Sequence, residues 1–357
     1  MGIIKRLAWR FVLLGLCLAL GLAGPGWAAE RIYFDFSILG RSLAVTELAN
    51  FAETGRPTGR LGYYLNWFTS PAQQQQLQVA LQTRYRVAPL VVERFSYTSS
   101  GVRLLGEIGE IIQTEARLNG GQAIRSAAIL AAAQPEGISV LSFLQQFPTD
   151  LRIDLQRLLR LIQRVQGILQ QTETTVAQLH QQAVHLAADS TFPAAPDLRQ
   201  SGPFTYQKRT LQILDPARQR QFAADLYLPT RPGGAEWPNL AAGSTPVVIM
   251  SNGLGAGRDR FDEIALHLVS HGFAIAIPDH PGSDRQRLRE FYAGQHRENF
   301  EAREYIDRPQ DITVLLNELE RLNQTELGQR LNLERVGMFG YSFGGSTALS
   351  LAGATLN

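Results

Sequence analysis

Ser342 has the sequence surroundings of a nucleophile. It is the middle residue of segment 340–344, which reads GYSFG and fits the pattern G-x-S-x-G. An apolar run at 336–339 precedes this segment and small residues follow it, so a strand, a tight turn and a helix are expected in that order. In such a turn Gly340 and Gly344 avoid collisions with neighbouring backbone, and the helix N-terminus favours developing negative charge. We therefore predict that Ser342 attacks acyl groups; the alternative is a glycine-rich turn kept for packing.

Acyl transfer also needs two backbone N–H groups aimed at the oxyanion. One comes from the residue after the nucleophile, here Phe343, and the other from the loop after an earlier strand. Segment 251–255 reads SNGLG, and its glycines Gly253 and Gly255 allow the backbone to fold so that the Leu254 amide points into the site. We predict an oxyanion hole formed by Leu254 and Phe343. A phosphate cradle is the alternative, although the loop lacks the lysine and the further glycine spacing of such cradles.

The elements that must position these residues follow from the apolar pattern of residues 204–357. Alternating segments at 204–214 and 221–228 predict a hairpin of two strands. Buried strands are expected at 247–250, 273–277 and 336–339, with helices at 259–270, at 307–322 and after Ser342. Because strand, loop and helix alternate strictly, the connections must be crossovers and the sheet mostly parallel.

This part of the chain resembles the front half of a serine α/β-hydrolase. It is similar in particular to platelet-activating-factor acetylhydrolases and to the related predicted dienelactone-hydrolase-like esterases. Three segments carry the resemblance: 251–255 for the oxyanion loop, 268–273 (LVSHGF) for the approach to the fourth strand, and 340–345 for the nucleophile elbow. One position departs from the pattern, since Asn252 stands where the acetylhydrolases usually carry histidine.

The resemblance implies a fold and an activity. The fold is an α/β-hydrolase fold, with a mostly parallel sheet and the front half only, preceded here by an all-α domain. The activity is hydrolysis of short acyl esters of phospholipids without a cofactor, often at lipid surfaces. The oxyanion amides are implied at Leu254 and Phe343, and an aspartate and a histidine complete a triad. The helical region resembles an uncharacterised domain that precedes such hydrolases in secreted bacterial proteins.

The triad acid and histidine are the missing parts of this pattern. In α/β-hydrolases the chain order is serine, acid, histidine, but the 15 residues after Ser342 include no His, Asp or Glu. His280, at the carboxyl end of a predicted strand, is expected to line the site together with Asn252, because ligands bind at that rim. As a general base it would need a chain order foreign to the fold. Three other residues are expected on helix surfaces or in packing contacts: Asp311, His267 and His271.

We therefore expect a longer esterase, truncated at its C-terminus in this sequence. Its substrate would be a small ester or lipid, its nucleophile Ser342, and its acid and base residues beyond Asn357. Two alternatives stay open. One is a secreted envelope or partner-binding protein with an inactive, relic hydrolase half, and the other is a polymer or lipid depolymerase on the same scaffold.

Residues 29–190 have the pattern of an all-α domain. Helix boundary signals occur at Thr46 and Gly55, at Ser70 and Pro71, and around an alanine-rich segment at 122–133. The longest predicted helix opens at Asp154. Apolar residues recur along it at spacings of three and four from Leu155 to Leu186, with an interruption at 172–175. We expect this stripe to face other helices of a bundle; a helix that lies on a membrane or binds a partner is the alternative.

The remaining boundaries follow from composition. Residues 1–28 have a basic start, 14 apolar residues and a small-residue end, which predicts a cleaved secretory signal and an exported protein; an uncleaved anchor is the alternative. Three prolines at 191–203 mark a linker before the core at 204–357. Cys17, the one cysteine, lies in the leader, so no disulfide framework or cysteine nucleophile is expected beyond it.

Charge and histidine spacing exclude several function classes. Without Lys5, Arg6 and Arg10 the chain has 31 basic against 32 acidic residues, which gives no electrostatic case for nucleic acid. His180 and His185 are five residues apart on one helix and lie on different faces. No carboxylate or third histidine accompanies them, so no metal site is predicted.

Overall fold

The computed structural model describes residues 28–36, 39–188, 197–231 and 241–355. The chain divides into two compact units, and the boundary in the sequence lies between Ala187 and Ala188. The predicted signal peptide and part of the predicted linker lie outside the described residues. Among the described helices, none is both long enough and apolar enough to cross a bilayer.

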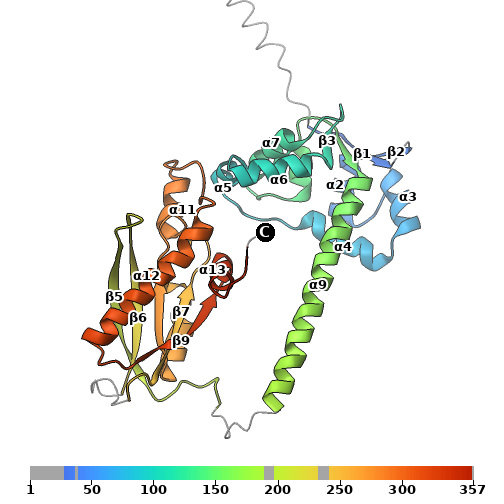
Figure 1. The fold of residues 1–357 in the computed structure, drawn as a ribbon. Coiled ribbons are helices and arrows are strands. Elements are labelled where there is room, and N and C mark those ends of the chain that lie inside the picture. The colour runs from blue at the N-terminus through green and yellow to red at the C-terminus, as the bar shows by residue number, and fades with distance from the viewer. Residues whose placement is uncertain (1–27, 37–38, 189–196, 232–240, 356–357) are drawn as a thin grey trace, which may run out of the picture. The chain divides into compact units, whose positions relative to one another are not determined.

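The N-terminal unit is mainly helical but also contains a small sheet (Figure 1). Its helices are α2 (Val45–Thr54), α3 (Gly59–Phe68), α4 (Pro71–Gln82), α5 (Pro89–Ser96), α6 (Ser99–Gly109), α7 (Gly121–Ala132), α8 (Val140–Gln145) and α9 (Leu155–Ala188). Its strands are β1 (Arg31–Phe36), β2 (Leu39–Ala44), β3 (Ile112–Thr114) and β4 (Leu151–Asp154), in the order β2-β1-β4-β3. The unit is mainly helical, as predicted, but it is not all-α, because it also contains this four-stranded sheet.

The core of the N-terminal unit lies between this sheet and the helices. Phe51 of α2, Ala127 of α7 and Phe147 after α8 are buried, and Ile32 of β1 and Leu151 of β4 pack in the same cluster. β1 pairs in parallel with β4, so Ile32 stands opposite Leu151 although they are far apart in sequence. Burial of these side chains supplies the main stabilisation of the unit.

Helix α9 differs from the other helices because its apolar stripe is exposed. It is one continuous helix of 34 residues, and Asp154 accepts a hydrogen bond from the Arg157 amide at its start, as expected. Side chains along the stripe, such as Ile168 and Leu179, are more than half exposed. Within the part of the chain that the structure describes, the expectation of a buried bundle face is therefore wrong.

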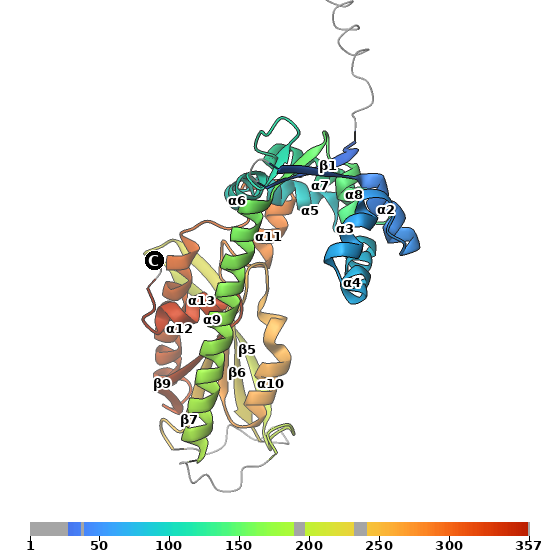
Figure 2. The ribbon, with the colours of Figure 1, turned by 90° about the vertical axis from the view of Figure 1, so that its right-hand side faces the viewer.

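The C-terminal unit is a five-stranded sheet with helices on both faces (Figures 1 and 2). Its strands are β5 (Thr205–Asp215), β6 (Arg220–Thr230), β7 (Thr245–Ser251), β8 (Ala274–Pro278) and β9 (Leu331–Gly340). Its helices are the 3-10 helix η1 (Arg258–Phe261), α10 (Asp262–Ser270), α11 (Arg285–Tyr292), α12 (Glu304–Thr325) and α13 (Phe343–Leu351). The order is β5-β6-β8-β7-β9; β8, β7 and β9 are parallel, and the predicted hairpin β5–β6 joins them antiparallel.

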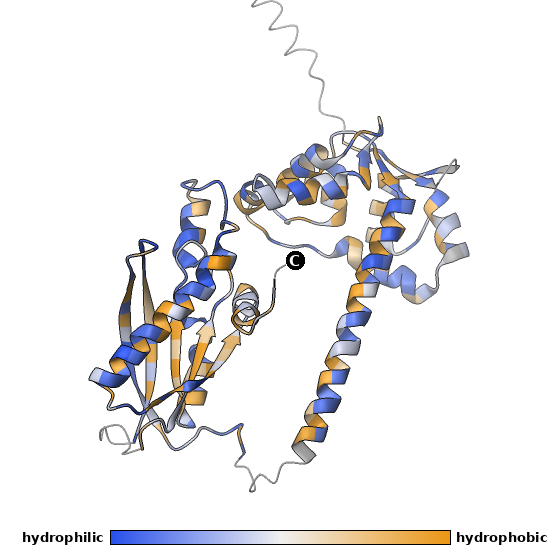
Figure 3. Cartoon of the chain, in the orientation of Figure 1, coloured by the Kyte–Doolittle hydropathy of each residue, from blue (hydrophilic) through white to orange (hydrophobic). Residues whose placement is uncertain are grey.

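Two apolar layers hold this sheet between its helices. Successive strand residues point to opposite faces, so Ile249 of β7 packs with Leu315 of α12 while Met250 packs with Val269 of α10. Colouring by hydropathy shows the strands β7 and β9 as largely apolar (Figure 3). The sheet is thus fixed from both sides, and the loops at the carboxyl ends of β7 and β9 project from a rigid frame.

Candidate active site

Ser342 lies at a strained turn between β9 and α13. Its φ of 55° and ψ of −118° place a residue other than glycine at positive φ, where L side chains are rarely found. Ser342 is the N-cap of α13, and its side chain is exposed. Strain of this kind costs about 1–3 kcal/mol and persists where the surrounding structure fixes it. The turn therefore presents the serine hydroxyl outward at the N-terminus of a helix.

Two glycines make the turn possible by allowing backbone segments to touch. A Cβ atom on Gly340 would lie 2.1 Å from the carbonyl oxygen of Gly344. A Cβ on Gly344 would lie 1.9 Å from the carbonyl oxygen of Ser251, at the end of β7. Real Cβ atoms do not come so close, so both positions require glycine. The elbow is thereby packed directly against the neighbouring strand.

The loop after β7 lies beside the elbow because the two strands are in register. Ser251 pairs with Gly340 in the parallel ladder, so the chain leaves both strands at the same edge of the sheet. A Cβ on Gly253 would lie 3.6 Å from the Ser342 hydroxyl oxygen. Gly255 has a φ of 74°, and its amide donates to the Ser283 carbonyl at 2.8 Å, which fixes the far side of the loop. The loop thus runs along the exposed serine.

Two amides next to the serine are without acceptors. In the described part of the chain, neither the Leu254 nor the Phe343 amide has a hydrogen-bond acceptor. Buried backbone N–H groups without a partner are rare, but the first N–H groups of a helix, such as that of Phe343, have no acceptor within the helix. Leu254 follows the glycine that contacts Ser342, and Phe343 follows Ser342 itself at the first position of α13. These are the donors that an oxyanion beside Ser342 would need.

None of the described histidines of the C-terminal unit bonds to the Ser342 hydroxyl. His280 bonds to Ser251 and Asp311, His271 to the Gln200 carbonyl, and His296 to Glu290. His267 packs edge to face on His271, and His180 and His185 are exposed on α9. Asp279, next to His280, forms an ion pair with Arg258. Within the described part of the C-terminal unit, Ser342 therefore lies beside Gly253 and the elbow glycines and has no hydrogen bond to a histidine.

His280 belongs to a buried chain of hydrogen bonds beneath the loop. Its Nε2 lies 2.9 Å from the Ser251 hydroxyl, and its Nδ1 lies 3.1 Å from Oδ2 of Asp311. Asp311 is fully buried rather than on a helix surface. Burial raises the pKa of Asp311, but hydrogen bonds from His280 and Arg220 outweigh it, so the pKa lies below its usual value. An ionised Asp311 accepts a hydrogen bond from Nδ1–H of His280, and the unprotonated Nε2 then accepts one from the Ser251 hydroxyl.

Ser251, His280 and Asp311 are the residue types of a catalytic triad, but they are closed to solvent. Ser251 has no exposed surface, so an ester cannot reach its hydroxyl. Burial lowers the pKa of His280 to about 4, and the bond to Asp311 offsets this only in part. His280 is therefore neutral near pH 7. His280 has a structural role, because its hydrogen bonds to Ser251 and Asp311 connect the end of β7 to helix α12 below the candidate site.

Arg308 connects both halves of the candidate site. It is buried on α12, and its Nη2 donates to the Asn252 carbonyl in the loop after β7. Its guanidinium carbon also lies 4.4 Å from the centre of the Phe343 ring, the residue after the nucleophile. Asn252, expected to line the site, is itself buried and held by this bond. One side chain thus contacts both segments that carry the free amides.

Sequence reasoning missed Arg308 and the role of Asp311. Both stand on the same helix face as buried Leu315 and Leu319. A charged pair on the apolar face of a predicted helix is the signal that could have revealed them, since buried charges are almost always paired. Asp311 also accepts from Arg218 and Arg220 at 2.9 Å each, which completes the network.

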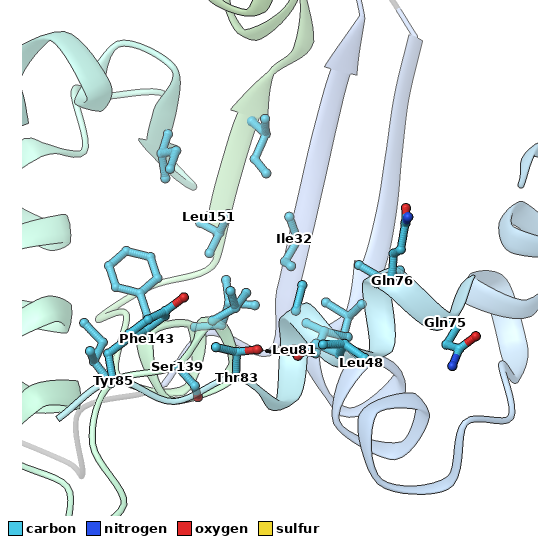
Figure 4. A pocket seen from close by; sticks show the side chains of 18 of the residues that line it. Ile32, Leu48, Gln75, Gln76, Leu81, Thr83, Tyr85, Ser139, Phe143 and Leu151 are labelled. Carbon is cyan, nitrogen blue, oxygen red and sulfur yellow. Dashed lines mark hydrogen bonds between the residues drawn. The ribbon is translucent and has the colours of Figure 1, made fainter. Parts of the chain in front are cut away.

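A cavity in the N-terminal unit offers no such chemistry. It has a volume of about 1200 Å³ and opens between the sheet and helices α4 and α8 (Figure 4). Ile32, Leu48, Leu81 and Phe143 point into it, and glutamine, threonine, serine and tyrosine side chains complete the lining. None of its lining residues is charged. It therefore presents an apolar surface rather than a catalytic group.

Comparisons with known proteins agree with this architecture. A family model described as "alpha/beta hydrolase fold" matches residues 246–355, which include the loop after β7 and the elbow. The C-terminal unit has an α/β-hydrolase fold. A second model, described as "Alpha/beta hydrolase of unknown function (DUF1400)", matches residues 28–154 of the N-terminal unit. No curated protein matches the chain.

Solved structures with similarity to the chain include hydrolases. A ferulic acid esterase from Streptomyces cinnamoneus is 20% identical, with a TM-score of 0.33, over 44% of this chain and 57% of the other. A dienelactone hydrolase from Anabaena variabilis is 21% identical, with a TM-score of 0.28, over 42% of this chain and 57% of the other. The chain thus spans little more than half the length of these two proteins.

Proposed function

We propose that the protein is a serine ester hydrolase that works through an acyl-enzyme at Ser342. The observation that carries the proposal is the exposed serine at a positive-φ elbow, with the unpaired Leu254 and Phe343 amides beside it. A hydroxyl in this position can reach an ester carbonyl, and the two amides can stabilise the negative charge that develops on its oxygen. The match of residues 246–355 to the α/β-hydrolase fold supports the proposal.

The reaction follows from these groups. The Ser342 oxygen attacks the ester carbonyl carbon, its proton passes to a general base, and the carbonyl oxygen becomes the oxyanion held by the two amides. Collapse expels the alcohol and leaves an acyl-serine, which water then hydrolyses. We propose that the general base is a residue outside the described part of the chain, because none of the described histidines of the C-terminal unit bonds to the Ser342 hydroxyl.

The proposed substrates are short acyl esters, including acetyl esters of phospholipids. The support is the similarity of segments 251–255, 268–273 and 340–345 to the corresponding segments of acetylhydrolases. The proposal includes export, guided by residues 1–28, and contact with lipid surfaces, where such substrates are found. No cofactor takes part in this chemistry.

The test is ester hydrolysis by the protein expressed from its intact gene. We expect turnover of p-nitrophenyl acetate and of a 2-acetyl phospholipid, with slower turnover of the palmitate ester. Ser342→Ala should lower kcat by about 10⁴-fold or more, whereas Ser346→Ala, one turn later on α13, should stay near the original rate. Equal rates for the Ser342 variant and the unmodified protein would reject the proposal and favour a non-catalytic, partner-binding protein.

A further inference from the structure

The exposed face of α9 needs a partner. Helix α9 has 34 residues, which corresponds to a length of about 51 Å at 1.5 Å per residue. From Ile162 to Leu186 its apolar side chains are exposed, several of them by more than half. Apolar and polar residues alternate along its surface (Figure 3). Monomeric soluble proteins rarely expose so long a continuous apolar stripe.

The spacing of this stripe is that of a coiled coil. Alternating steps of three and four residues connect ten positions without a break: Leu155, Leu158, Ile162, Val165, Leu169, Thr172, Val176, Leu179, Ala183 and Leu186. Nine of the ten are apolar, and the exception, Thr172, bonds its hydroxyl to the Ile168 carbonyl of its own helix. A strict repeat of 3.5 residues over four heptads keeps the apolar seam facing one supercoiled partner helix.

We propose that α9 forms a coiled coil with α9 of a second copy of this chain. A coiled-coil seam needs a helix of similar length with an unburied apolar stripe. Among the described helices, the next longest is α12 with 22 residues, and its apolar residues such as Ile312 and Leu315 are buried against its own sheet. The identical helix of a second copy supplies the matching seam.

The polar face of α9 favours this partner over a lipid surface. Helices that lie on membranes carry many Lys and Arg residues on the polar face and bulky aromatic residues on the apolar face. Helix α9 has three arginines, all in its first third, no lysine and no aromatic residue other than histidine, and its polar face is mainly glutamine. Glu173 is its only acidic residue, so two copies bring no repulsive carboxylates together along most of the seam.

Sedimentation equilibrium of the protein expressed from its intact gene tests the proposal. We expect twice the mass of one chain at about 50 µM, and a loss of at least 100-fold in affinity when Leu169→Asp and Val176→Asp are combined in the seam. The matched control, Gln163→Asp with Gln170→Asp, adds the same charge on the outer face and should remain dimeric. A monomeric unmodified protein would overturn the proposal, whether or not it binds vesicles of anionic phospholipid.

Disulfide trapping keeps the proposal testable if the seam variant loses its helix. In a Cys17→Ser background, cysteines replacing Leu169 and Thr172 should cross-link two chains under mild oxidation, for parallel or antiparallel helices. Cysteines replacing Gln170 and Thr174, which face outward, should cross-link at least tenfold more slowly. Equal rates for the two pairs would show that the seam is not an interface and would contradict the proposal.

Discussion

At the scale of single residues, the proposed site at Ser342 includes buried neighbours that hold its loops together. Arg308 holds the Asn252 carbonyl and stacks on Phe343, so it links the two segments with free amides. Burial lowers the pKa of Arg308 to about 10, with Glu304 and Asp311 opposing the shift, so its guanidinium remains charged near pH 7. We therefore expect Arg308 to position the proposed oxyanion hole.

The Arg308→Met variant tests this role. We expect kcat for a short ester to fall about 10- to 100-fold with KM changed little, because misplacement by an ångström can cost this much. Arg303→Met, at the N-cap of the same helix, is the matched control, since Arg303 is exposed and, among the described residues, forms an ion pair only with Asp307. A loss in KM alone, or the same loss in both variants, would speak against a positioning role.

His280 makes folding stability depend on pH. Its pKa is lowered from 6.5 to about 4 by burial, so between these values the unfolded chain binds more protons than the folded one. We therefore expect the free energy of unfolding to rise with pH across this window, and acidification from pH 7 to pH 4 to lower it by about 3 kcal/mol.

Urea unfolding at several pH values from 4 to 7 measures how the free energy of unfolding depends on pH, and comparison of variants gives the part due to His280. In His280→Gln the contribution of His280 to the slope should disappear, whereas His271→Gln, at the end of α10, should keep it. An unchanged slope in the His280 variant would show that the histidine is not responsible.

At the scale of elements, the elbow needs glycine at one position of α13 but not at the next. A Cβ on Gly344 would meet the Ser251 carbonyl at 1.9 Å, while a Cβ on Gly345 has nothing nearer than the Gly340 carbonyl at 3.7 Å. Gly344→Ala should therefore lower the free energy of unfolding by about 1–3 kcal/mol through overpacking. Gly345→Ala should leave it unchanged or raise it by up to about 1 kcal/mol, because alanine has the higher helix propensity. Thermal unfolding compares the stability of the two variants, and a similar loss of stability in both would contradict the described packing.

Most elements of the C-terminal unit could be predicted from the sequence because their signals are local. In the hairpin β5–β6 polar and apolar residues alternate, and the buried strands β7 and β8 are short apolar runs between turn residues.

Helix boundaries could be predicted only in part. In the N-terminal unit, Ser70 and Pro71 start α4 with a capping box, as expected, but Thr46 is not the cap of α2, which begins one residue earlier at Val45. Helix α11 was missed because its sequence is mostly polar.

The small N-terminal sheet could not be predicted in the same way. Strands β3 and β4 have three and four residues, which is too short for an alternating pattern to stand out. β4 also continues directly into α9, so no turn signal separates strand from helix. Its pairing with β1 depends on contacts between residues far apart in sequence, such as Ile32 and Leu151, which local periodicity does not encode.

At the scale of the whole molecule, the two units have separate cores. Phe51 is buried in a cluster drawn from residues 29–153, and the clusters around the five-stranded sheet use other residues only. Phe51→Ala should cost the N-terminal unit about 3–5 kcal/mol by leaving a cavity. Calorimetry should show one transition moved to lower temperature and the other unchanged; a shift of both transitions would indicate a single cooperative core.

We propose that Ser342, rather than the buried Ser251, is the nucleophile. The most direct measurement is labelling of the protein from its intact gene with a fluorophosphonate, followed by peptide mass spectrometry. We expect a single adduct on Ser342 that is absent from the Ser342→Ala variant, and no adduct on Ser251, whose hydroxyl is bonded to His280 and has no exposed surface. A folded protein that takes up no label, or takes it up on Ser251, would show that Ser342 is not the nucleophile.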